Sequence, residues 1–259
     1  MIRVRPKKQL GQHFLNDKTI ASDIVDALSP NVNDLLEIGP GTGILTDYIL
    51  KKNILNFKII EIDTESVEYL NVKYPELNER LILGDFLKMD LKNVFTSKFS
   101  IIGNFPYNIS SQILFKAWDN RQSVDEIVGM FQKEVAERVA TGPGSKTYGI
   151  LSVLLQAFYH IEYLFTVPAE VFTPPPKVQS GVIRLKRNNT LKLDCNEKFF
   201  KTVVKTAFNQ RRKTISNSLK SLGFKNYLEE LSHLAGKRPE QLCVNEFVEI
   251  SQTLERGHD

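Results

Sequence analysis

The sequence contains little cysteine and no long apolar run, and both absences narrow the class of protein. Only two of its 259 residues are cysteines, Cys195 and Cys243, and neither belongs to a CxxC or Cys/His pattern. A disulfide framework and a structural zinc site are therefore unsupported, and two free thiols fit a reducing compartment. No stretch approaches roughly 18 consecutive apolar residues, and "MIRVRPKKQLGQHF" lacks the apolar core of a signal peptide. We expect a cytoplasmic protein that does not contact a membrane.

The chain has no internal repeats or low-complexity tracts, and its composition is that of an ordinary globular protein, with 42% hydrophobic and 25% charged residues. Its positive charge is unevenly distributed. Residues 181–259 carry 15 lysines and arginines against 9 acidic residues, a net charge of +6, whereas residues 1–180 have a net charge of −2. A second basic cluster, Arg3, Arg5, Lys7 and Lys8, precedes the first acidic residue. Such clusters favour a polyanionic partner, although a solvated surface kept for solubility explains them as well.

Short apolar runs alternate with helical patterns between residues 34 and 132, as in "DLLEIG", "FKIIEID", "RLILGDF" and "FSIIGN". Continuous apolar strands indicate a parallel sheet covered on both faces, so we expect a doubly wound α/β domain. After residue 189 the apolar residues recur at helical spacing, as in "NEKFFKTVVKTAF". We therefore expect two domains, an α/β domain over 1–189 and a small all-α domain over 190–259.

A glycine-rich turn follows the first of these strands. In "LLEIGPGTGIL" the glycines Gly39, Gly41 and Gly43 stand where a strand gives way to a helix, which lets the backbone approach a ligand closely. This pattern alone is weak evidence, because a tight turn without a ligand and a nicotinamide-dinucleotide site are both alternatives. The next strand ends in Glu61, 18 residues after Gly43, close to the spacing at which an acid meets ribose hydroxyls. Asp63 is interpreted as a helix N-cap.

Two further polar residues end neighbouring strands, Asp85 in "LILGDFL" and Asn104 in "FSIIGNFPY". Ligands of open α/β sheets bind outside the carboxyl ends of the strands, so the glycine turn, Glu61, Asp85 and Asn104 are expected to face one crevice. An Asp at such a point can accept a hydrogen bond from an adenine amine, or simply cap a turn.

These segments resemble a class I S-adenosylmethionine-dependent methyltransferase, with "EIGPGTG" as cofactor loop and "GNFPY" as the Asn/Asp-x-Pro-Tyr/Phe motif of enzymes that methylate an adenine amine. More narrowly, the chain resembles the ribosomal RNA adenine dimethylase family. The matching segments are "KKQLGQHFLND" (7–17), "LEIGPGTGILT" (36–46), "EID" (61–63), "GDFL" (84–87), "GNFPYNISSQIL" (103–114), "QKEVAERV" (132–139), "GPGSKTYGILSVLLQ" (142–156), "FTPPPKVQS" (172–180) and "AFNQRRKTISNSL" (207–219).

The resemblance implies a Rossmann-like methyltransferase sheet, S-adenosylmethionine as methyl donor and no metal. It implies N6,N6-dimethylation of two adjacent adenosines near the 3′ end of small-subunit (16S) ribosomal RNA, in a pre-30S particle during subunit biogenesis, by a monomer. It also implies that a basic segment, residues 1–16, closes over the site. The implied cofactor-binding positions are His13, Leu15, Gly39, Gly41, Glu61, Asp85 and Asn104. Many bacterial members carry Asn where this chain has His13.

The expected catalytic group is Asn104, Phe105, Pro106 and Tyr107. The lone pair of an adenine amine is delocalised into the ring, so methylation requires that nitrogen to become more tetrahedral. The side-chain oxygen of Asn104 and the backbone carbonyl of Phe105, aimed by Pro106, would each accept one N–H of that amine. Tyr107 would stack on the target base, with Phe172 as a candidate for its other face. A core position beside a rigid turn is the alternative for Phe172.

The all-α domain is expected to bind RNA. Basic side chains would hold phosphates without reading sequence, so specificity would come from RNA shape. The expected RNA-binding positions are Phe172, Arg184, Arg211, Arg212, Lys213, Lys7 and Lys8. There are three alternative functions. The first is a dimethylase that acts on one large-subunit adenine, and the second is an RNA-binding assembly or transcription factor that keeps the fold without needing catalysis. The third is a nicotinamide-dependent dehydrogenase. The last leaves "NFPY" and the basic domain unexplained.

Overall fold

The computed structural model describes residues 4–257, so Arg3 of the N-terminal basic cluster lies outside the described residues. The chain divides into two compact units. The first unit contains the residues up to Glu137 together with Ile161–Arg187, and the second contains Arg138–His160 with the residues from Asn188 onward. The expected division after residue 189 differs from this one mainly in the segment Arg138–His160.

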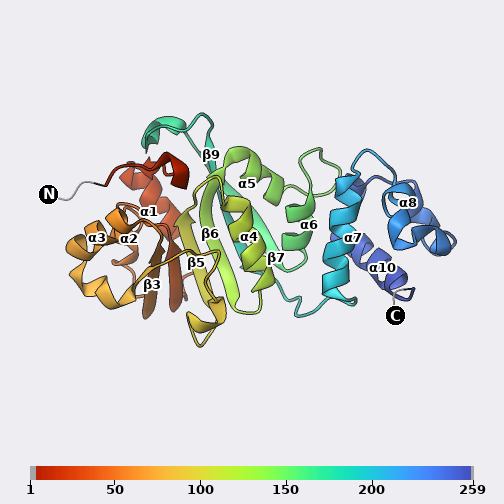
Figure 1. Cartoon of the computed structure of the whole chain (residues 1–259), viewed down its shortest axis with the longest axis horizontal. Helices are drawn as coiled ribbons and strands as arrows, with labels where there is room; N and C mark the ends of the chain where they lie inside the picture. The colour runs from red at the N-terminus through yellow and green to blue at the C-terminus, as the bar shows by residue number, and fades with distance from the viewer. Residues whose placement is uncertain (1–3, 258–259) are drawn as a thin grey trace. The chain divides into compact units, whose positions relative to one another are not determined.

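The first unit is built on a seven-stranded sheet (Figure 1). The strand order is β4 (Leu81–Leu83), β3 (Asn56–Glu61), β2 (Asp34–Ile38), β5 (Phe99–Asn104), β6 (Val124–Gln132), β9 (Ser180–Arg187) and β7 (Tyr159–Val167). Strands β2 to β6 pair in parallel, and β9 runs antiparallel to β6. All five residues of β2 are buried, as are the first five of β5, because helices cover both faces of the sheet. The expected Rossmann-like α/β fold is confirmed.

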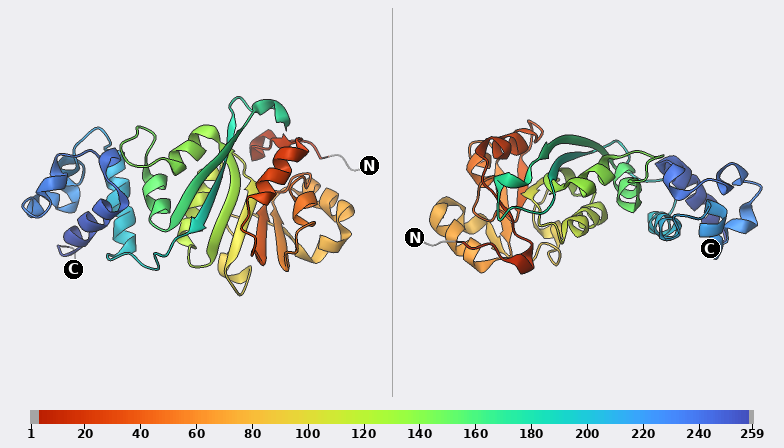
Figure 2. Two further views of the ribbon diagram at one scale, coloured as in Figure 1. Left: turned by 180° about the vertical axis from the view of Figure 1, so that it is seen from behind. Right: turned by 90° about the horizontal axis from the view of Figure 1, so that it is seen from above.

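The helices of the first unit are α1 (Lys18–Asp26), α2 (Thr46–Ile49), α3 (Thr64–Lys73), α4 (Ser110–Asp119) and the start of α5 (Lys133–Ala140). Opposite views show α1 in front of one face of the sheet and α4 in front of the other (Figures 1 and 2). On the α1 face, Ile24 of α1 belongs to one apolar cluster with Leu35, Ile59 and Ile102 of the central strands. The side chain of Asp63 accepts a hydrogen bond from the Glu65 N–H, which confirms the predicted N-cap of α3.

A second, two-stranded sheet ties the N-terminal segment to a distant loop. Strand β1 (Phe14–Leu15) pairs antiparallel with β8 (Phe172–Thr173). The short 3₁₀ helices of this unit are Lys8–Leu10, Pro75–Arg80, Leu91–Asn93 and Ala169–Val171. The pairing fixes the residues around His13 against the loop that begins at Phe172.

The second unit is helical, with α6 (Ile150–Gln156), α7 (Glu197–Asn209), α8 (Ile215–Ser218), α9 (Ser232–Ala235) and α10 (Val244–Glu255). Its 3₁₀ helices are Lys220–Leu222, Phe224–Tyr227 and Pro239–Gln241. Five consecutive residues of α6, from Leu151 to Leu155, are buried. A helix that is apolar all round needs partners on several sides, and α6 contacts both α7 and α10. This explains why Arg138–His160 groups with helices that follow much later in the sequence. Within residues 4–257, no helix is long and apolar enough to cross a membrane.

Candidate functional site

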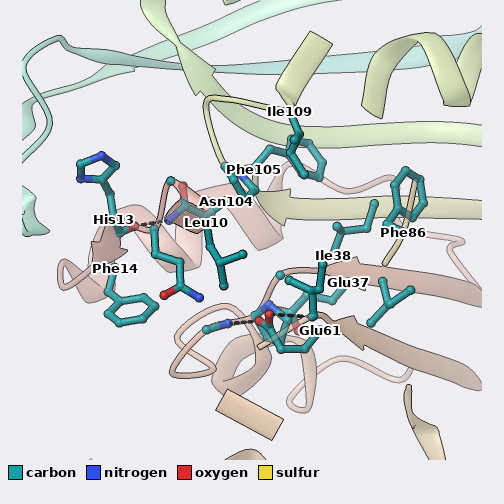
Figure 3. A pocket seen from close by; sticks show the side chains of 18 of the residues that line it. Leu10, His13, Phe14, Glu37, Ile38, Glu61, Phe86, Asn104, Phe105 and Ile109 are labelled. Atoms are coloured by element: carbon teal, nitrogen blue, oxygen red, sulfur yellow. Dashed lines mark hydrogen bonds between the residues drawn. The ribbon is translucent and has the colours of Figure 1, made fainter. Parts of the chain in front are cut away.

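One cavity of the first unit lies at the carboxyl ends of β2, β3, β4 and β5 (Figure 3). The predicted residues that line it are His13, Leu15, Gly39, Gly41, Glu61, Asp85, Asn104, Phe105, Pro106 and Tyr107. Parallel strands end at the same edge of a sheet, so residues that are far apart in sequence converge here. The crevice expected from the strand ends is therefore present, with the N-terminal segment as an additional wall.

The glycine turn approaches its neighbours too closely for side chains. Gly41 and Gly43 have φ angles of 59° and 78°, in the left-handed region that favours glycine. A Cβ atom on Gly41 would lie 2.7 Å from the ring of Phe14, and one on Gly43 would lie 2.7 Å from Tyr74. The turn thus presents bare backbone to the cavity while Phe14 packs against it.

Glu61 is held in place by backbone amides. Its carboxylate accepts hydrogen bonds from the N–H groups of Gly41 (3.2 Å), Ile62 (2.8 Å) and Asp63 (2.9 Å). Burial raises the pKa of Glu61, and these three hydrogen bonds act against that rise. An acid anchored in this way has a fixed orientation, as recognition of a pair of hydroxyl groups requires.

Glu37 also lines the cavity, and the sequence analysis did not assign it a role. It is fully buried, its Oε2 accepts a hydrogen bond of 2.7 Å from the Thr46 hydroxyl, and its Oε1 has no hydrogen-bond partner among residues 4–257. Burial raises the pKa of Glu37 to about 8, with a smaller contribution from the neighbouring Glu61 charge. At neutral pH this carboxyl therefore keeps its proton. Its place between the apolar residues Leu36 and Ile38 of a buried strand was the available signal.

Asp85 and Phe86 follow β4 and line the cavity. Phe86 lies on the side of the cavity away from Phe14 (Figure 3). The Asp85 carboxylate accepts a hydrogen bond of 2.9 Å from the Leu87 N–H, which caps a single helical turn. Lys88 lies 3.8 Å from the same carboxylate, with its side chain 86% exposed, so this ion pair is weak. Asp85 thus combines the expected place at the cavity with the capping role that was its alternative.

Asn104 is the last residue of β5, and its side-chain amide donates a hydrogen bond of 2.9 Å to the backbone carbonyl of His13 (Figure 3). Because the NH₂ group is engaged there, the Oδ1 atom, which lies in the same amide plane, faces away from that carbonyl and can accept a hydrogen bond. Phe105 extends the strand, since its N–H donates to the Met130 carbonyl at 3.2 Å. A Cβ atom on Gly129 would lie 2.0 Å from the Phe105 ring, so that glycine makes room for the anchored side chain.

Tyr107 lies at the start of the loop that leads into α4. Its hydroxyl is 2.5 Å from the hydroxyl of Ser180, and its ring is stacked on the His13 ring with centroids 5.5 Å apart. The His13 Nδ1 atom in turn lies 2.7 Å from the Pro174 carbonyl oxygen. The imidazole therefore covers one face of Tyr107 and bridges it to the loop after Phe172.

Three of the predicted RNA-binding residues make contacts within the first unit. Phe172 is 2% exposed and lies in the apolar core opposite Leu15 of β1, so the proposed stacking on a base is wrong and the core alternative is correct. The Lys7 ammonium forms ion pairs with Asp63 and Glu65, because the N-terminal segment folds back onto the start of α3. Arg184 donates to the Ala27 carbonyl and pairs with Glu162 at 2.7 Å, so it fastens elements of the first unit together.

The remaining basic positions differ in exposure. Arg211 donates to the Ser145 carbonyl at 3.3 Å and lies 3.6 Å from the Glu240 carboxylate, which ties it to the second unit. Arg212, Lys213 and Lys8 are exposed. Within residues 4–257, no group of three or more His, Cys, Asp or Glu side chains is arranged to hold a metal ion.

Replacement of Glu37 by Gln tests whether the buried acid is protonated. With a pKa that rises from 4.5 to about 8 on folding, the proton of Glu37 contributes stability that is complete below about pH 4.5 and lost as the pH rises through about 8. Gln keeps the size and cannot ionise. Between about pH 5 and 8, the free energy of unfolding of the native protein should fall relative to that of Glu37→Gln by about 1.4 kcal/mol per pH unit. Urea denaturation at each pH measures this; parallel pH profiles would show that the carboxyl is ionised.

Comparison with known proteins identifies the family that the chain matches. Residues 3–255 match the family described as "Ribosomal RNA adenine dimethylase". The chain is 59% identical over 256 residues to "Ribosomal RNA small subunit methyltransferase A" of Cytophaga hutchinsonii, covering 98% of this chain and 99% of the relative. It is 57% identical to the protein of the same name from Flavobacterium johnsoniae, covering 98% of each.

Among solved structures, a dimethyladenosine transferase from Plasmodium falciparum matches with a TM-score of 0.81 at 26% identity, covering 95% of this chain and 98% of the other. The family match and the identity to the bacterial relatives both extend over nearly the whole chain. The chain therefore belongs to the ribosomal RNA adenine dimethylase family.

Proposed function

We propose that this protein transfers methyl groups from S-adenosylmethionine to the N6 amines of two adjacent adenosines near the 3′ end of small-subunit ribosomal RNA. The observation that carries the proposal is the acceptor geometry of Asn104, held at the end of β5 in the same cavity as Glu61 and Asp85. The identity of 59% to a relative named as a small-subunit methyltransferase supports this RNA over a large-subunit target.

The cavity fits a cofactor that contains a nucleoside. Glu61, oriented by three backbone amides, would accept hydrogen bonds from the ribose hydroxyls, and Asp85 would accept one from the adenine amine. The unpaired Oε1 side of the protonated Glu37 supplies a further polar group on the cavity wall. S-adenosylmethionine, when bound, supplies a methyl group on a sulfonium, which is already a strong electrophile.

The residues of the chain would act on the nucleophile. In the first transfer, Asn104 Oδ1 would accept one N–H of the adenine amine and the Phe105 carbonyl the other, which favours a tetrahedral nitrogen and the positive charge that develops on it. As the C–N bond forms and the methyl–sulfur bond breaks, the nitrogen would release one proton to solvent, and in the second transfer one N–H would remain for these acceptors. Both acceptors are preorganised, Asn104 by the His13 carbonyl and Phe105 by its hydrogen bond to Met130 and its buried ring. Tyr107 would supply a stacking surface, and a base that uses the face covered by His13 displaces the imidazole.

We further propose that the enzyme acts as a monomer on a pre-30S particle in the cytoplasm. The exposed Arg212 and Lys213 of the second unit, and Lys8 of the first, would contact phosphates. These contacts carry no sequence information, so the fold of the ribosomal RNA would select the target.

Asn104→Ala removes the side-chain acceptor. We expect S-adenosylhomocysteine to bind with little change, while kcat on immature small subunits falls by about 10²- to 10³-fold. Isothermal titration and transfer of labelled methyl groups measure the two quantities, and Asn71→Ala, on the exposed surface of α3, is the matched control. Full turnover by Asn104→Ala would reject the mechanism. Mapping of N6,N6-dimethyladenosine in ribosomal RNA, with and without the protein, tests the target, and no new modification would favour an RNA-binding role without catalysis.

Two substitutions separate the ring of Tyr107 from its hydroxyl. Base–aromatic stacking is worth about 1–3 kcal/mol, so Tyr107→Ala should raise the KM for RNA by roughly 5- to 150-fold. Tyr107→Phe keeps the ring and loses the contact with Ser180, and its KM should stay within about threefold of the native value. Steady-state kinetics at saturating cofactor give both values. Equal increases in the KM of both variants would show that the hydroxyl, and not the ring, contributes to RNA binding.

The double substitution Arg212→Gln, Lys213→Gln tests the phosphate contacts. We expect weaker binding to small-subunit RNA and a slope of log K against log salt that is smaller by about 1 to 2. Filter binding at several salt concentrations measures the slope. The control is Lys18→Gln, Lys92→Gln, which removes the same charge at exposed positions outside the basic clusters. Identical slopes for both double variants would show that Arg212 and Lys213 do not contact phosphates of the RNA.

A further inference from the structure

The ammonium group of Lys116 lies behind the loop that carries Asp85. Its Nζ atom donates hydrogen bonds to the backbone carbonyls of Leu87 at 2.9 Å and Met89 at 2.5 Å, and it lies 5.5 Å from the centroid of the Phe86 ring. Lys116 belongs to α4, whereas the two carbonyls belong to the segment after β4. One half-buried lysine therefore joins α4 to the loop whose residues Asp85, Phe86 and Leu87 line the cavity.

The segment held by Lys116 is a single helical turn with little support of its own. The N–H groups of Lys88 and Met89 donate to the Asp85 carbonyl at 3.0 and 3.1 Å, and the Asp85 carboxylate caps the Leu87 N–H. An isolated turn is unfavourable because it fixes several dihedral angles for few hydrogen bonds, and its last carbonyls have no helical partners. A cation at the carbonyl end satisfies them and complements the turn's dipole. Lys116 thereby fixes the position from which Asp85 and Phe86 face the cavity.

Burial of this ammonium has a desolvation cost that two nearby carboxylates partly offset. Desolvation lowers the pKa of Lys116, while the negative charges of Asp85 and Asp90 act in the opposite direction. A lysine kept merely for solubility would extend into water. Here the ammonium instead makes two hydrogen bonds to main-chain oxygens, which is the arrangement expected of a group that holds a loop.

The other end of α4 is fixed to the catalytic loop. The Ser110 hydroxyl donates to the Tyr107 carbonyl at 3.1 Å, and the Ile109 N–H donates to the Pro106 carbonyl at 3.2 Å. The apolar face of α4, which includes Ile113 and Trp118, is buried, so the helix cannot slide along the sheet. Lys116 lies about 9 Å along the helix axis from Ser110. A rigid element therefore spans from the Asn104 loop to the Asp85 loop.

We propose that Lys116 is a positioning residue that sets the Asp85 loop at a fixed place relative to Asn104, so that the adenine of the cofactor is recognised through its amine. The proposal rests on the proposed function, in which Asp85 accepts a hydrogen bond from that amine. Its action is indirect, since Lys116 does not line the cavity.

Lys116→Met tests the proposal, because it keeps most of the aliphatic stem and removes the charge and the donors. In the full-length enzyme we expect the Kd for S-adenosylhomocysteine and the KM for S-adenosylmethionine to rise about tenfold, with kcat within about twofold. Lys116→Arg, which can still donate to both carbonyls, should recover a large part of the affinity. The exposed Lys92→Met is the matched control and should bind as the native protein does.

A second ligand separates positioning from general support of the fold. S-inosylhomocysteine carries oxygen where the adenine amine stands, so it lacks the donor that Asp85 would recognise. The native protein should prefer S-adenosylhomocysteine over this analogue, and Lys116→Met should lose most of that preference. If Lys116→Met weakens both ligands equally, or leaves both unchanged, the inference is wrong. If the native protein binds S-adenosylhomocysteine no better than the analogue, the assumed role of Asp85 in the proposed function fails instead.

Discussion

The parallel pairing of β2, β3, β4 and β5 is the constraint on which the site depends. Strand pairing aligns their carboxyl ends, and each end is followed by one component of the cavity: the glycine turn, Glu61, Asp85 or Asn104. Tight packing supports this alignment, because the ring of Phe105 fills space that a side chain on Gly129 would occupy. The place of Asn104 is thus a consequence of the sheet, whereas the orientation of its side-chain amide depends on the His13 carbonyl.

Two buried carboxyl groups give the cavity its electrostatic character. Glu61 is compensated by three amide hydrogen bonds, whereas Glu37 has one hydroxyl donor and keeps its proton at neutral pH. Burial is the main cause of the raised pKa of Glu37, and the negative charge of the neighbouring Glu61 raises it further. With Glu37 neutral, this pair of acids places at most one negative charge in the cavity, which is compatible with a cofactor that carries positive charge.

Site residues at strand ends and the helix cap could be predicted from the sequence. The places of residues that are determined by tertiary contacts could not. Glu61, Asp85 and Asn104 could be found because polar residues that end apolar strands must lie at one edge of a parallel sheet. Phe172 was misplaced because its burial depends on pairing with Leu15, more than 150 residues earlier. Whether a basic side chain is exposed or paired with an acid cannot be predicted from the sequence, for the same reason. Lys7 and Arg184 have acidic partners that only the fold brings near, whereas Arg212 and Lys213 remain exposed.

His13 joins the N-terminal segment, which lines the cavity, to the orientation of the Asn104 side chain. Its backbone carbonyl receives the Asn104 amide, so Oδ1 is fixed as the free acceptor only while this segment lies over the cavity. Any residue type offers that carbonyl, and this role therefore survives an exchange of His13 for the Asn that many family members carry. The imidazole ring is different, since its stacking on Tyr107 and its contact with Pro174 depend on the side chain. Substitution at this position thus removes the ring contacts with Tyr107 and Pro174 and leaves the orientation of Asn104 intact.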